Sequence, residues 1–301
     1  MKVRFIDCGP NIRDHWLAIK PSYPVPVDIN PEQSPADLAG LLEGYDVCIT
    51  DHTRLDASLL ERCGHRLKHV IYFGTGAASI VDLPVADRLG IHVHTIRNYG
   101  DRTVAEHTIA LLMAAARQIG AQHASLRAGH WTKLPGIELK GKRLGVVGLG
   151  AIGQEVASIG AALGLDVLAW SRSGAQSPHG RNVALDTLLA DADIVTLHLA
   201  LNEDTRGFMN ATRLAQMKPG AILVNTARGA LVDEGALLDA LHSGALGHAA
   251  LDVFEHEPLT AGSPWVSAPN VTLTAHCGYW TESATRNQVH MVLDIVSNLQ
   301  G

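Results

Sequence analysis

The sequence lacks an excess of basic residues. Its 301 residues contain 24 Lys and Arg against 30 Asp and Glu, so the net charge at neutral pH is −6. Nucleic-acid binding rests on basic side chains that neutralise phosphates. We therefore expect no nucleic-acid partner.

Long apolar runs are missing as well. No uninterrupted run approaches the roughly 18 residues that a membrane helix needs, and the N-terminal "MKVRFIDCGP" has no long apolar core of a signal peptide. The four cysteines, Cys8, Cys48, Cys63 and Cys277, are scattered without a Cys-x-x-Cys pair, which is typical of free thiols. These absences predict a cytoplasmic protein with no membrane partner, no disulfide frame and no bound metal.

Short apolar runs alternate with helical patterns almost from end to end. This alternation predicts an α/β fold with parallel sheets flanked by helices. Four early strands are indicated by "VRFID", "DVCIT", "HVIYF" and "IHVHT", with a helix expected around residues 35–42. Six later strands are indicated by "RLGVVGLG", "DVLAW", "DIVTLHL", "AILVNTA", "HAALDV" and "VTLTAH".

Two Rossmann-like domains are predicted from this order. A long helix is expected over Arg102–Gly120, because the side chains of one helical face are mainly apolar: Val104, Thr108, Leu111, Leu112 and Ala115. The first domain comprises residues 1–99 plus 282–301, with a flavodoxin-like arrangement. The second comprises residues 100–281. The last helix, Glu282–Leu299, follows the completed second sheet and is expected to return to the first domain.

A glycine-rich loop stands between a strand and a helix in the second domain. Gly148, Gly150 and Gly153 have the G-x-G-x-x-G spacing, with Ala151 and Ile152 between the last two. The three glycines would permit a tight turn, close approach of a pyrophosphate and close packing of the helix on the strand. Glycine-rich turns are common, but the strand before and the helix after this one favour a dinucleotide site over a purely structural turn.

The end of the next strand, "VLAWSRS", lacks the acid that usually holds the adenosine ribose of NAD. Ser171 removes the repulsion that a carboxylate would exert on a 2′-phosphate, and Arg172 offers a guanidinium to bind it. Ser173 adds a hydroxyl donor, and Arg181 is a minor candidate. The alternative is a solvated loop whose arginine binds nothing. We favour NADP as the cofactor, with NADPH preferred over NADH.

Three polar residues follow later strands. Arg228 comes after "AILVNTA", Glu257 lies in the loop after "HAALDV", and His276 ends "VTLTAH". A site that transfers hydride to a 2-keto acid needs a cation for the carboxylate, a proton donor for the carbonyl oxygen and a partner for that donor. Each residue alone has an ordinary structural interpretation: a surface ion pair, a loop acid or one of 16 histidines.

Taken together, the motifs resemble the D-isomer-specific 2-hydroxyacid dehydrogenase family. The matching segments are "GVVGLGAIGQEVA", "LHLALNEDTRGFMN", "MKPGAILVNTARGALVDEGALLDAL", "AALDVFEHEPL" and "VTLTAHCGYWTE", preceded by "HVIYFGTGAASIVDL" and "NYGDRTVAEHTIALLMA". The resemblance implies that Arg228 holds the substrate carboxylate, that His276 exchanges the proton and that Glu257 binds His276. It also implies that the first domain binds the substrate.

The resemblance implies further site residues. Asp252 matches the residue that receives the nicotinamide carboxamide, and Thr103 matches a hydroxyl that contacts the cofactor. Backbone N–H groups of Thr75, Gly76 and Ala77 match the loop that binds the substrate carboxylate. Other residues expected at the cofactor lie in the matching segments: His198, Thr205, Thr226, Ala227 and Gly278.

The sequence departs from the family pattern in three places. Ala200 stands where proline is common, the acid at Ser171 is missing, and "FGTGAASIVDL" is one residue longer than usual. Loss of that acid together with a nearby arginine is similar to the NADP-preferring glyoxylate and hydroxypyruvate reductases. We therefore expect NADPH-dependent reduction of a small 2-keto acid to the D-2-hydroxy acid, and the reverse reaction.

Other readings stay open at this point. Corepressors use the same fold to sense cofactors, and phosphoglycerate dehydrogenases share the motifs, although we expect no C-terminal regulatory domain here. Formate dehydrogenase relatives carry glutamine at the position of Glu257. The family also implies a homodimer around the long helix and "HASLRAGHWTKL", with Trp131 as either an interface anchor or ordinary core. Candidate walls of the substrate pocket are Asp51–Arg54, Tyr99 and Trp280.

Overall fold

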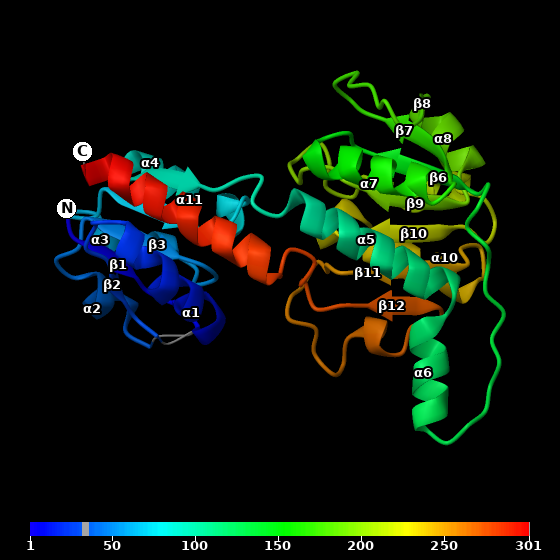
Figure 1. Cartoon of the computed structure of the whole chain (residues 1–301), viewed down its shortest axis with the longest axis horizontal. Helices are drawn as coiled ribbons and strands as arrows, with labels where there is room; N and C mark the ends of the chain where they lie inside the picture. The colour runs from blue at the N-terminus through cyan, green and yellow to red at the C-terminus, as the bar shows by residue number, and fades with distance from the viewer. Residues whose placement is uncertain (32–35, 301) are drawn as a thin grey trace. The chain divides into compact units, whose positions relative to one another are not determined.

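The computed structural model describes residues 1–31 and 36–300, which form two compact units. Unit 1 comprises Met1–Gly100 with Trp280–Gly301, and unit 2 comprises Asp101–Tyr279. Each unit contains one parallel sheet flanked by helices (Figure 1). The predicted fold class, α/β with two Rossmann-like domains, is therefore confirmed.

Unit 1 has a five-stranded sheet in the order β2-β1-β3-β4-β5, the flavodoxin-like order. The strands are β1 (Val3–Phe5), β2 (Asp28–Ile29), β3 (Val47–Thr50), β4 (His69–Tyr72) and β5 (His92–Thr95). The helices are α1 (Pro10–Ile19), α2 (Leu38–Leu42), α3 (Ala57–Cys63), α4 (Leu83–Arg88) and α11 (Glu282–Gln300). Two 3₁₀ turns, η1 (Lys20–Ser22) and η2 (Ala77–Ser79), lie in the loops.

Alternation of side chains along the strands produces two apolar layers in unit 1. On one face Phe5, Ile49 and Ile71 pack with Trp16 of α1 and Val292 of α11. The opposite face packs against α2, α3 and α4 through residues that include Leu42, Leu60 and Ala86. Figure 1 shows α11, the last helix of the chain, lying beside α1.

Unit 2 has a seven-stranded sheet in the order β12-β11-β10-β9-β6-β7-β8. The strands are β6 (Arg143–Val147), β7 (Asp166–Trp170), β8 (Arg181–Asn182), β9 (Ile194–Leu197), β10 (Ile222–Asn225), β11 (His248–Leu251) and β12 (Val271–Leu273). The chain runs outward from β6 through β7 to β8, then returns to β9 on the other side of β6 and continues to β12. The strand order therefore reverses between β6 and β9, where α/β sheets bind ligands beyond the strand ends.

Helices cover both faces of this sheet. They are α5 (Asp101–Ala116), α7 (Ala151–Ala162), α8 (Leu185–Asp191), α9 (Ala211–Gln216) and α10 (Glu234–His242), with 3₁₀ turns η3 (Gly229–Leu231) and η4 (Pro264–Val266). A further helix, α6 (Ile119–Arg127), has no buried residue. Helices α5 and α7 pack together on one face through Leu112, Val156 and their neighbours. Helices α8, α9 and α10 pack on the other face. No helix of the described residues has both the length and the apolarity needed to cross a membrane.

The sequence prediction was wrong about the long helix. Helix α5 ends at Ala116 rather than at Gly120, because Gln118 adopts a left-handed backbone conformation with φ of 51°. A separate helix, α6, then follows. The helix expected around residues 35–42 begins at Leu38, and residues 32–35 of that region lie outside the described part of the chain.

Candidate active site

Most predicted site residues of unit 2 follow the carboxyl ends of its parallel strands. Gly148 follows β6, Ser171 follows β7, His198 follows β9, Thr226 follows β10 and Asp252 follows β11. Because the strands are parallel and adjacent, these positions lie along one edge of the sheet. The fold therefore gathers polar groups that are far apart in the sequence.

The glycine loop meets the steric requirements of a dinucleotide site. Gly148 has φ of +102°, and a Cβ atom there would lie 2.4 Å from the carbonyl oxygen of His198. A Cβ on Gly153 would lie 2.0 Å from the carbonyl oxygen of Gly148, so helix α7 can pack this closely only with glycine. A Cβ on Gly150 would meet nothing within 4 Å. Side chains at Gly148 and Gly153 are thus excluded by the fold, whereas the space beside Gly150 is open to a ligand.

The N-terminus of α7 completes this cradle. Gly150 is its N-cap residue and no side chain caps it, so Ala151 and Ile152 begin a helix whose first backbone N–H groups are available to an anion. The helix has 12 residues, long enough to direct the positive end of its dipole at a phosphate. The loop and the helix therefore fit the pyrophosphate of a dinucleotide.

At the end of β7, Arg172 already has a partner. Its Nη1 atom lies 3.2 Å from Oδ2 of Asp204, which belongs to the loop after β9. Both side chains are exposed, so the ion pair contributes little stability and leaves Arg172 able to turn toward a ligand. The hydroxyls of Ser171 and Ser173 lie 2.9 Å apart. Arg181 is instead paired with Asp166 at 3.1 Å.

Two residues expected at the cofactor have structural contacts of their own. The hydroxyl of Thr205, which is buried, donates to the carbonyl of Ala200 at 2.7 Å and accepts from the N–H of Asn202 at 2.8 Å. Burial lowers the pKa of His198 to about 3, although part of the residue is accessible to solvent. Its Nε2 lies 2.9 Å from the hydroxyl of Thr196. The contacts of Thr205 hold the turn after β9, and burial keeps the His198 ring neutral.

Glu257 and His276 form a close pair. Oε2 of Glu257 lies 2.6 Å from Nδ1 of His276, and Oε1 accepts from the N–H of Phe254 at 2.8 Å. Burial acts to raise the pKa of Glu257, but the hydrogen bonds from His276 and Phe254 and the positive charge of Arg228 outweigh it, so the pKa is lowered. The carboxylate is therefore ionised near neutral pH and fixes one nitrogen of the ring, which directs Nε2 away from it.

Local contacts place Arg228 near this pair. The side-chain amide of Asn225 donates to the Arg228 carbonyl at 2.9 Å and accepts from the N–H of Ala227 at 3.0 Å. A Cβ on Gly229 would lie only 1.9 Å from the carbonyl carbon of Phe254, so glycine lets η3 contact the loop that carries Glu257. Arg228 Nη1 donates to the Ala227 carbonyl at 2.6 Å. The half-buried guanidinium has donors left for a substrate.

Asp252 organises the loop that carries His276. It is almost fully buried and accepts from the hydroxyl of Thr274 at 2.6 Å and from the backbone N–H groups of Cys277 at 3.0 Å and Gly278 at 2.9 Å. Burial alone would raise the pKa of Asp252, but hydrogen bonds from His107, Thr274 and these backbone groups lower it to about 2. The carboxylate is therefore permanently charged at neutral pH.

The backbone of His276 is fixed by the same residue. The N–H of His276 donates to the Asp252 carbonyl at 2.7 Å, and His276 has a left-handed φ of 50°. Sequence reasoning missed two residues that also contact Asp252, His107 and Thr274. Nε2 of His107 lies 3.0 Å from the hydroxyl oxygen of Thr274. His107 lies one helical turn after Thr103 on α5, and this spacing was the signal that could have identified it.

Helix α5 also contacts the end of β10. The hydroxyls of Thr108 and Thr226 lie 2.8 Å apart, and Thr108 also donates to the Val104 carbonyl. Thr103 is half-buried in the first turn of α5. The predicted cofactor residues Thr226 and Thr103 are thus both positioned by this helix and its neighbours.

In unit 1, the predicted substrate loop leads into η2. The hydroxyl of Thr75 donates to the Ile96 carbonyl at 3.2 Å. The Gly76 carbonyl accepts from the backbone N–H of Ser79, and the Ala77 carbonyl accepts from those of Ile80 and Val81. Within residues 1–31 and 36–300, no acceptor is assigned to the N–H groups of Gly76 and Ala77. The loop therefore has backbone donors that suit a carboxylate.

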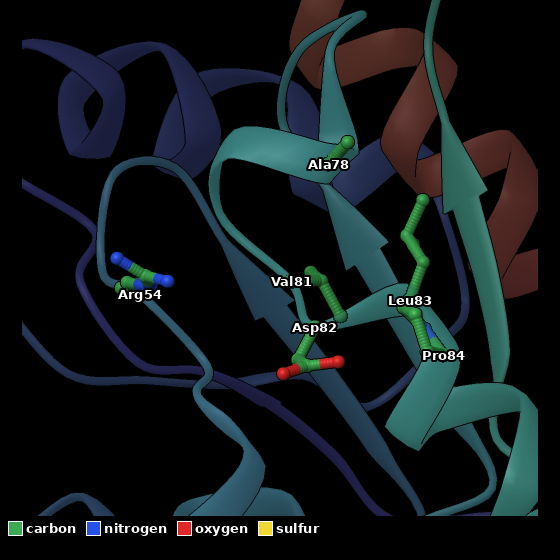
Figure 2. A pocket seen from close by; sticks show the side chains of 6 residues that line it. All are labelled: Arg54, Ala78, Val81, Asp82, Leu83 and Pro84. Carbon is green, nitrogen blue, oxygen red and sulfur yellow. The ribbon is translucent and has the colours of Figure 1, made fainter.

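A small pocket of about 240 Å³ lies beside this loop (Figure 2). Its lining residues are Arg54, Ala78, Val81, Asp82, Leu83 and Pro84. Arg54 is the last residue of a turn that the buried carboxylate of Asp7 stabilises. This carboxylate accepts hydrogen bonds of 2.7–3.0 Å from the backbone N–H groups of Asp51, His52 and Thr53. Of the predicted pocket walls, Asp51–Arg54 contributes Arg54 to this pocket. The other two do not line it: Tyr99 packs against the apolar core of unit 1, and Trp280 is exposed.

Comparisons with known proteins agree with this geometry. Residues 109–278 match the family model for the NAD binding domain of D-isomer specific 2-hydroxyacid dehydrogenase. The chain is 39% identical over 260 residues to a glyoxylate reductase of Aeropyrum pernix, covering 82% of this chain and 76% of that protein. A D-3-phosphoglycerate dehydrogenase of Archaeoglobus fulgidus is 36% identical over 284 residues, which cover 91% of this chain but only 53% of that protein. The chain thus spans about half the length of that relative.

A solved structure described as the pyruvate reductase of Chlamydomonas reinhardtii is also similar. Its TM-score is 0.87 at 30% identity, with 99% of this chain and 96% of the other covered. The similarity therefore extends over both units.

Proposed function

Because the chain belongs to the D-isomer-specific 2-hydroxyacid dehydrogenase family, and is thus an oxidoreductase, we propose that it reduces a small 2-keto acid with NADPH. The product is the D-2-hydroxy acid, and the substrate is of the glyoxylate or hydroxypyruvate type. The observation that carries this proposal is the 2.6 Å contact between Glu257 and His276 with the guanidinium of Arg228 nearby.

His276 is the proton donor in this mechanism. Its Nδ1 is held by Glu257, so Nε2 faces the substrate and donates a proton to the carbonyl oxygen as the alkoxide develops. A nicotinamide held at this site would supply the hydride for the carbonyl carbon. Glu257 stabilises the protonated ring before transfer and orients the neutral ring afterwards. In the reverse direction His276 accepts the proton of the hydroxy acid.

Arg228 binds the substrate carboxylate and polarises its carbonyl group. A guanidinium presents several donors in a plane, so one side chain can contact both oxygens. For unit 1, predicted from the sequence as residues 1–99 with 282–301, we propose a part in substrate binding through the backbone N–H groups of Gly76 and Ala77, as the family resemblance implies. The pocket lined by Arg54 then belongs to the part of the protein that selects the substrate.

We propose the following cofactor contacts. Gly148, Gly150 and Gly153 with the start of α7 hold the pyrophosphate, and Arg172 with Ser171 and Ser173 holds the 2′-phosphate of NADP. Asp252 and Gly278 are proposed as contacts of the nicotinamide carboxamide, because the family resemblance implies this role for Asp252. The remaining contacts proposed along the sheet edge are Thr103, His198, Thr205, Thr226 and Ala227.

The cofactor preference is the direct test. The native enzyme should use NADPH with a kcat/KM at least tenfold above that for NADH, since one charge-assisted phosphate contact contributes about 1.5–3 kcal/mol. Ser171→Asp combined with Arg172→Ala should erase or reverse this preference. Asp204→Asn should increase it, because the ion pair no longer competes with the phosphate. Equal use of both cofactors by the native enzyme would show that Arg172 does not bind a phosphate.

The substrate is tested in the same assay. Glyoxylate, hydroxypyruvate, pyruvate and phenylpyruvate are compared as oxidants of NADPH, and D-3-phosphoglycerate is included as a reductant because the phosphoglycerate dehydrogenases are similar to this chain. Highest kcat/KM with glyoxylate or hydroxypyruvate supports the proposal. A clear preference for D-3-phosphoglycerate would assign the alternative function.

We also propose a homodimer in a reducing compartment, the cytoplasm. No residue of α6 is buried, and the segment that returns from it contains Trp131, which is 82% exposed. Figure 1 shows α6 extending from the sheet of unit 2. A second copy would cover these side chains, and the free thiols of Cys8, Cys48, Cys63 and Cys277 suit a reducing environment.

A further inference from the structure

Three histidines on two neighbouring strands of unit 1 form a cluster that the proposed reaction does not use. His69 is the first residue of β4, and His92 and His94 lie on β5. In the register of these parallel strands, His69 is paired with His92 and Ile71 with His94. Since side chains alternate along a strand, all three rings lie on one face of the sheet.

The rings are in direct contact. Nδ1 of His69 lies 3.1 Å from Nε2 of His94, and the centroids of these two rings are 5.3 Å apart. The rings of His69 and His92 are stacked, with their centroids 5.4 Å apart. Two imidazole nitrogens bound to one tetrahedral Zn²⁺ ion, each at about 2.0–2.1 Å, are separated by about 3.3 Å. The observed separation of the two nitrogens is therefore close to that of a chelating pair.

We infer that His69 and His94 bind a divalent transition-metal ion, with His92 as the third ligand. Zn²⁺, Cu²⁺ and Ni²⁺ suit imidazole ligands, and water completes the coordination shell. His92 is exposed, so its ring can turn toward the ion without breaking the core. Binding replaces the hydrogen bond between the two nitrogens. Whichever ring donates in that bond then carries its proton on its other nitrogen, so neutral rings release no proton.

The state of the rings supports metal binding. Burial lowers the pKa of His69, with further contributions from His94, His92 and Lys68, and burial together with His92 lowers that of His94. Neutral imidazoles carry the lone pair that a metal ion needs. The positive charge of Lys68, next to His69 in the chain, opposes metal binding because it repels a cation.

The cluster is separate from the proposed active site. His69 and His92 are the first residues of β4 and β5 and His94 is the third residue of β5, whereas Thr75–Ala77 follows the carboxyl end of β4. Strand β5 is an edge strand, so an ion shared by the two strands would fasten the edge of the sheet. The inference is thus independent of the proposed function and is tested without measuring activity.

A second group of possible ligands must be controlled. His107, Asp252 and Cys277 place ligand atoms within 4.8 Å of one another in unit 2. The Asp252 carboxylate already accepts hydrogen bonds from Thr274, Cys277 and Gly278, so it would lose these on binding an ion. Titrations are therefore also made in a Cys277→Ser background.

The experiment is calorimetric titration of the full-length chain with ZnCl₂ at neutral pH. We expect one site, with affinity at least tenfold weaker in His69→Gln and in His94→Gln, and a smaller loss in His92→Gln. His65→Gln, which alters an exposed histidine of the same unit, is the matched control and should leave binding unchanged. Zn²⁺ should also raise the unfolding temperature of the native chain.

Two outcomes would overturn the inference. One is affinity that does not change in the three cluster variants, and the other is binding that disappears in Cys277→Ser alone. If a cluster variant fails to fold by circular dichroism, proton NMR of the native chain replaces it. Zn²⁺ must then shift the ring signals of His69, His92 and His94, and unshifted signals would refute the site.

Discussion

At the scale of single residues, the site depends on carboxylates that hold other groups in place. Glu257 binds one nitrogen of His276, and Asp252 accepts from the backbone and hydroxyl groups around it. The left-handed backbone of His276, with φ of 50°, is uncommon for a residue with a side chain. The hydrogen bond from its N–H to Asp252 and the contact with Glu257 together stabilise this conformation.

The Glu257–His276 pair should determine the pH dependence of the reaction. The pKa of Glu257 is lowered, so its charge is present throughout the assay range and stabilises the protonated ring. Glu257→Gln removes the charge and keeps the shape. Reduction requires the protonated ring, so the pH above which kcat/KM declines should move downward when the charge of Glu257 is removed. Oxidation requires the neutral ring, so its rising limb should move in the same direction.

The measurement is a set of pH–rate profiles in both directions with saturating cofactor. Glu255→Gln, two residues away and exposed, is the control and should leave both profiles in place. Profiles that do not move in Glu257→Gln would mean that Glu257 does not stabilise the proton on His276.

Arg228 should be sensitive to a change that preserves its charge. Arg228→Lys loses the planar set of donors, so kcat/KM for keto acid reduction should fall by a factor of about 10² or more. NADPH affinity, measured by fluorescence, should change little. Arg206→Lys alters an exposed arginine that pairs with Glu255 and should keep native activity. An active Arg228→Lys enzyme would show that this residue does not hold the substrate.

At the scale of elements, Asp252 connects β11 to the loop after β12. Its pKa is lowered to about 2 from 3.8, so its stabilisation is complete above pH 4 and is lost as the pH falls toward 2. The shift corresponds to roughly 2 kcal/mol. Asp252→Asn leaves donors without acceptors, so at pH 7 it should lower the free energy of unfolding by about 1–3 kcal/mol.

Urea unfolding at several pH values measures this effect. The difference between the native chain and Asp252→Asn should shrink between pH 4 and pH 2, because the native carboxylate also becomes protonated. Asp239→Asn, an exposed acid on α10, should follow the native curve. A difference that stays constant with pH would show that the charge of Asp252 does not contribute to stability.

The sequence predicted the elements whose pattern is local. Long apolar strands and the G-x-G-x-x-G loop are visible in the chain, because alternation and glycine sterics act over a few residues. Strands β2 and β8 have two residues each, too few to show a period, and the break at Gln118 depends on one backbone angle. These features were therefore missed.

Contacts between distant segments were predictable only in part. Glu257 and His276 were expected to meet because the family resemblance pairs them. The ion pair of Arg172 with Asp204 and the hydrogen bond of His107 with Thr274 join segments whose proximity depends on the folded sheet. The position of His107 one helical turn after Thr103 marks it as a site candidate, but no spacing in the sequence indicates which distant residue it meets.

At the scale of the whole molecule, the segment from α6 to β6 is the least covered part of unit 2. It spans residues 119–142, and its exposed apolar side chains are Ile119, Leu126, Trp131 and Ile137. Residues 128–142 have almost no regular structure, and long loops of this kind usually have a function. A large apolar side chain such as Trp131 costs free energy in water unless another surface covers it.

The proposed homodimer makes Trp131 the side chain to test. The native chain should have a mass in solution twice that of the 32.1 kDa chain, measured by light scattering after size exclusion. Trp131→Glu places a charge in the interface and should weaken association by at least about 2 kcal/mol, or roughly 30-fold, so that monomer appears at micromolar concentration. Val266→Glu alters another exposed apolar residue of unit 2 and should remain dimeric. A monomeric native chain would refute the dimer, and a dimeric Trp131→Glu variant would show that the interface lies elsewhere.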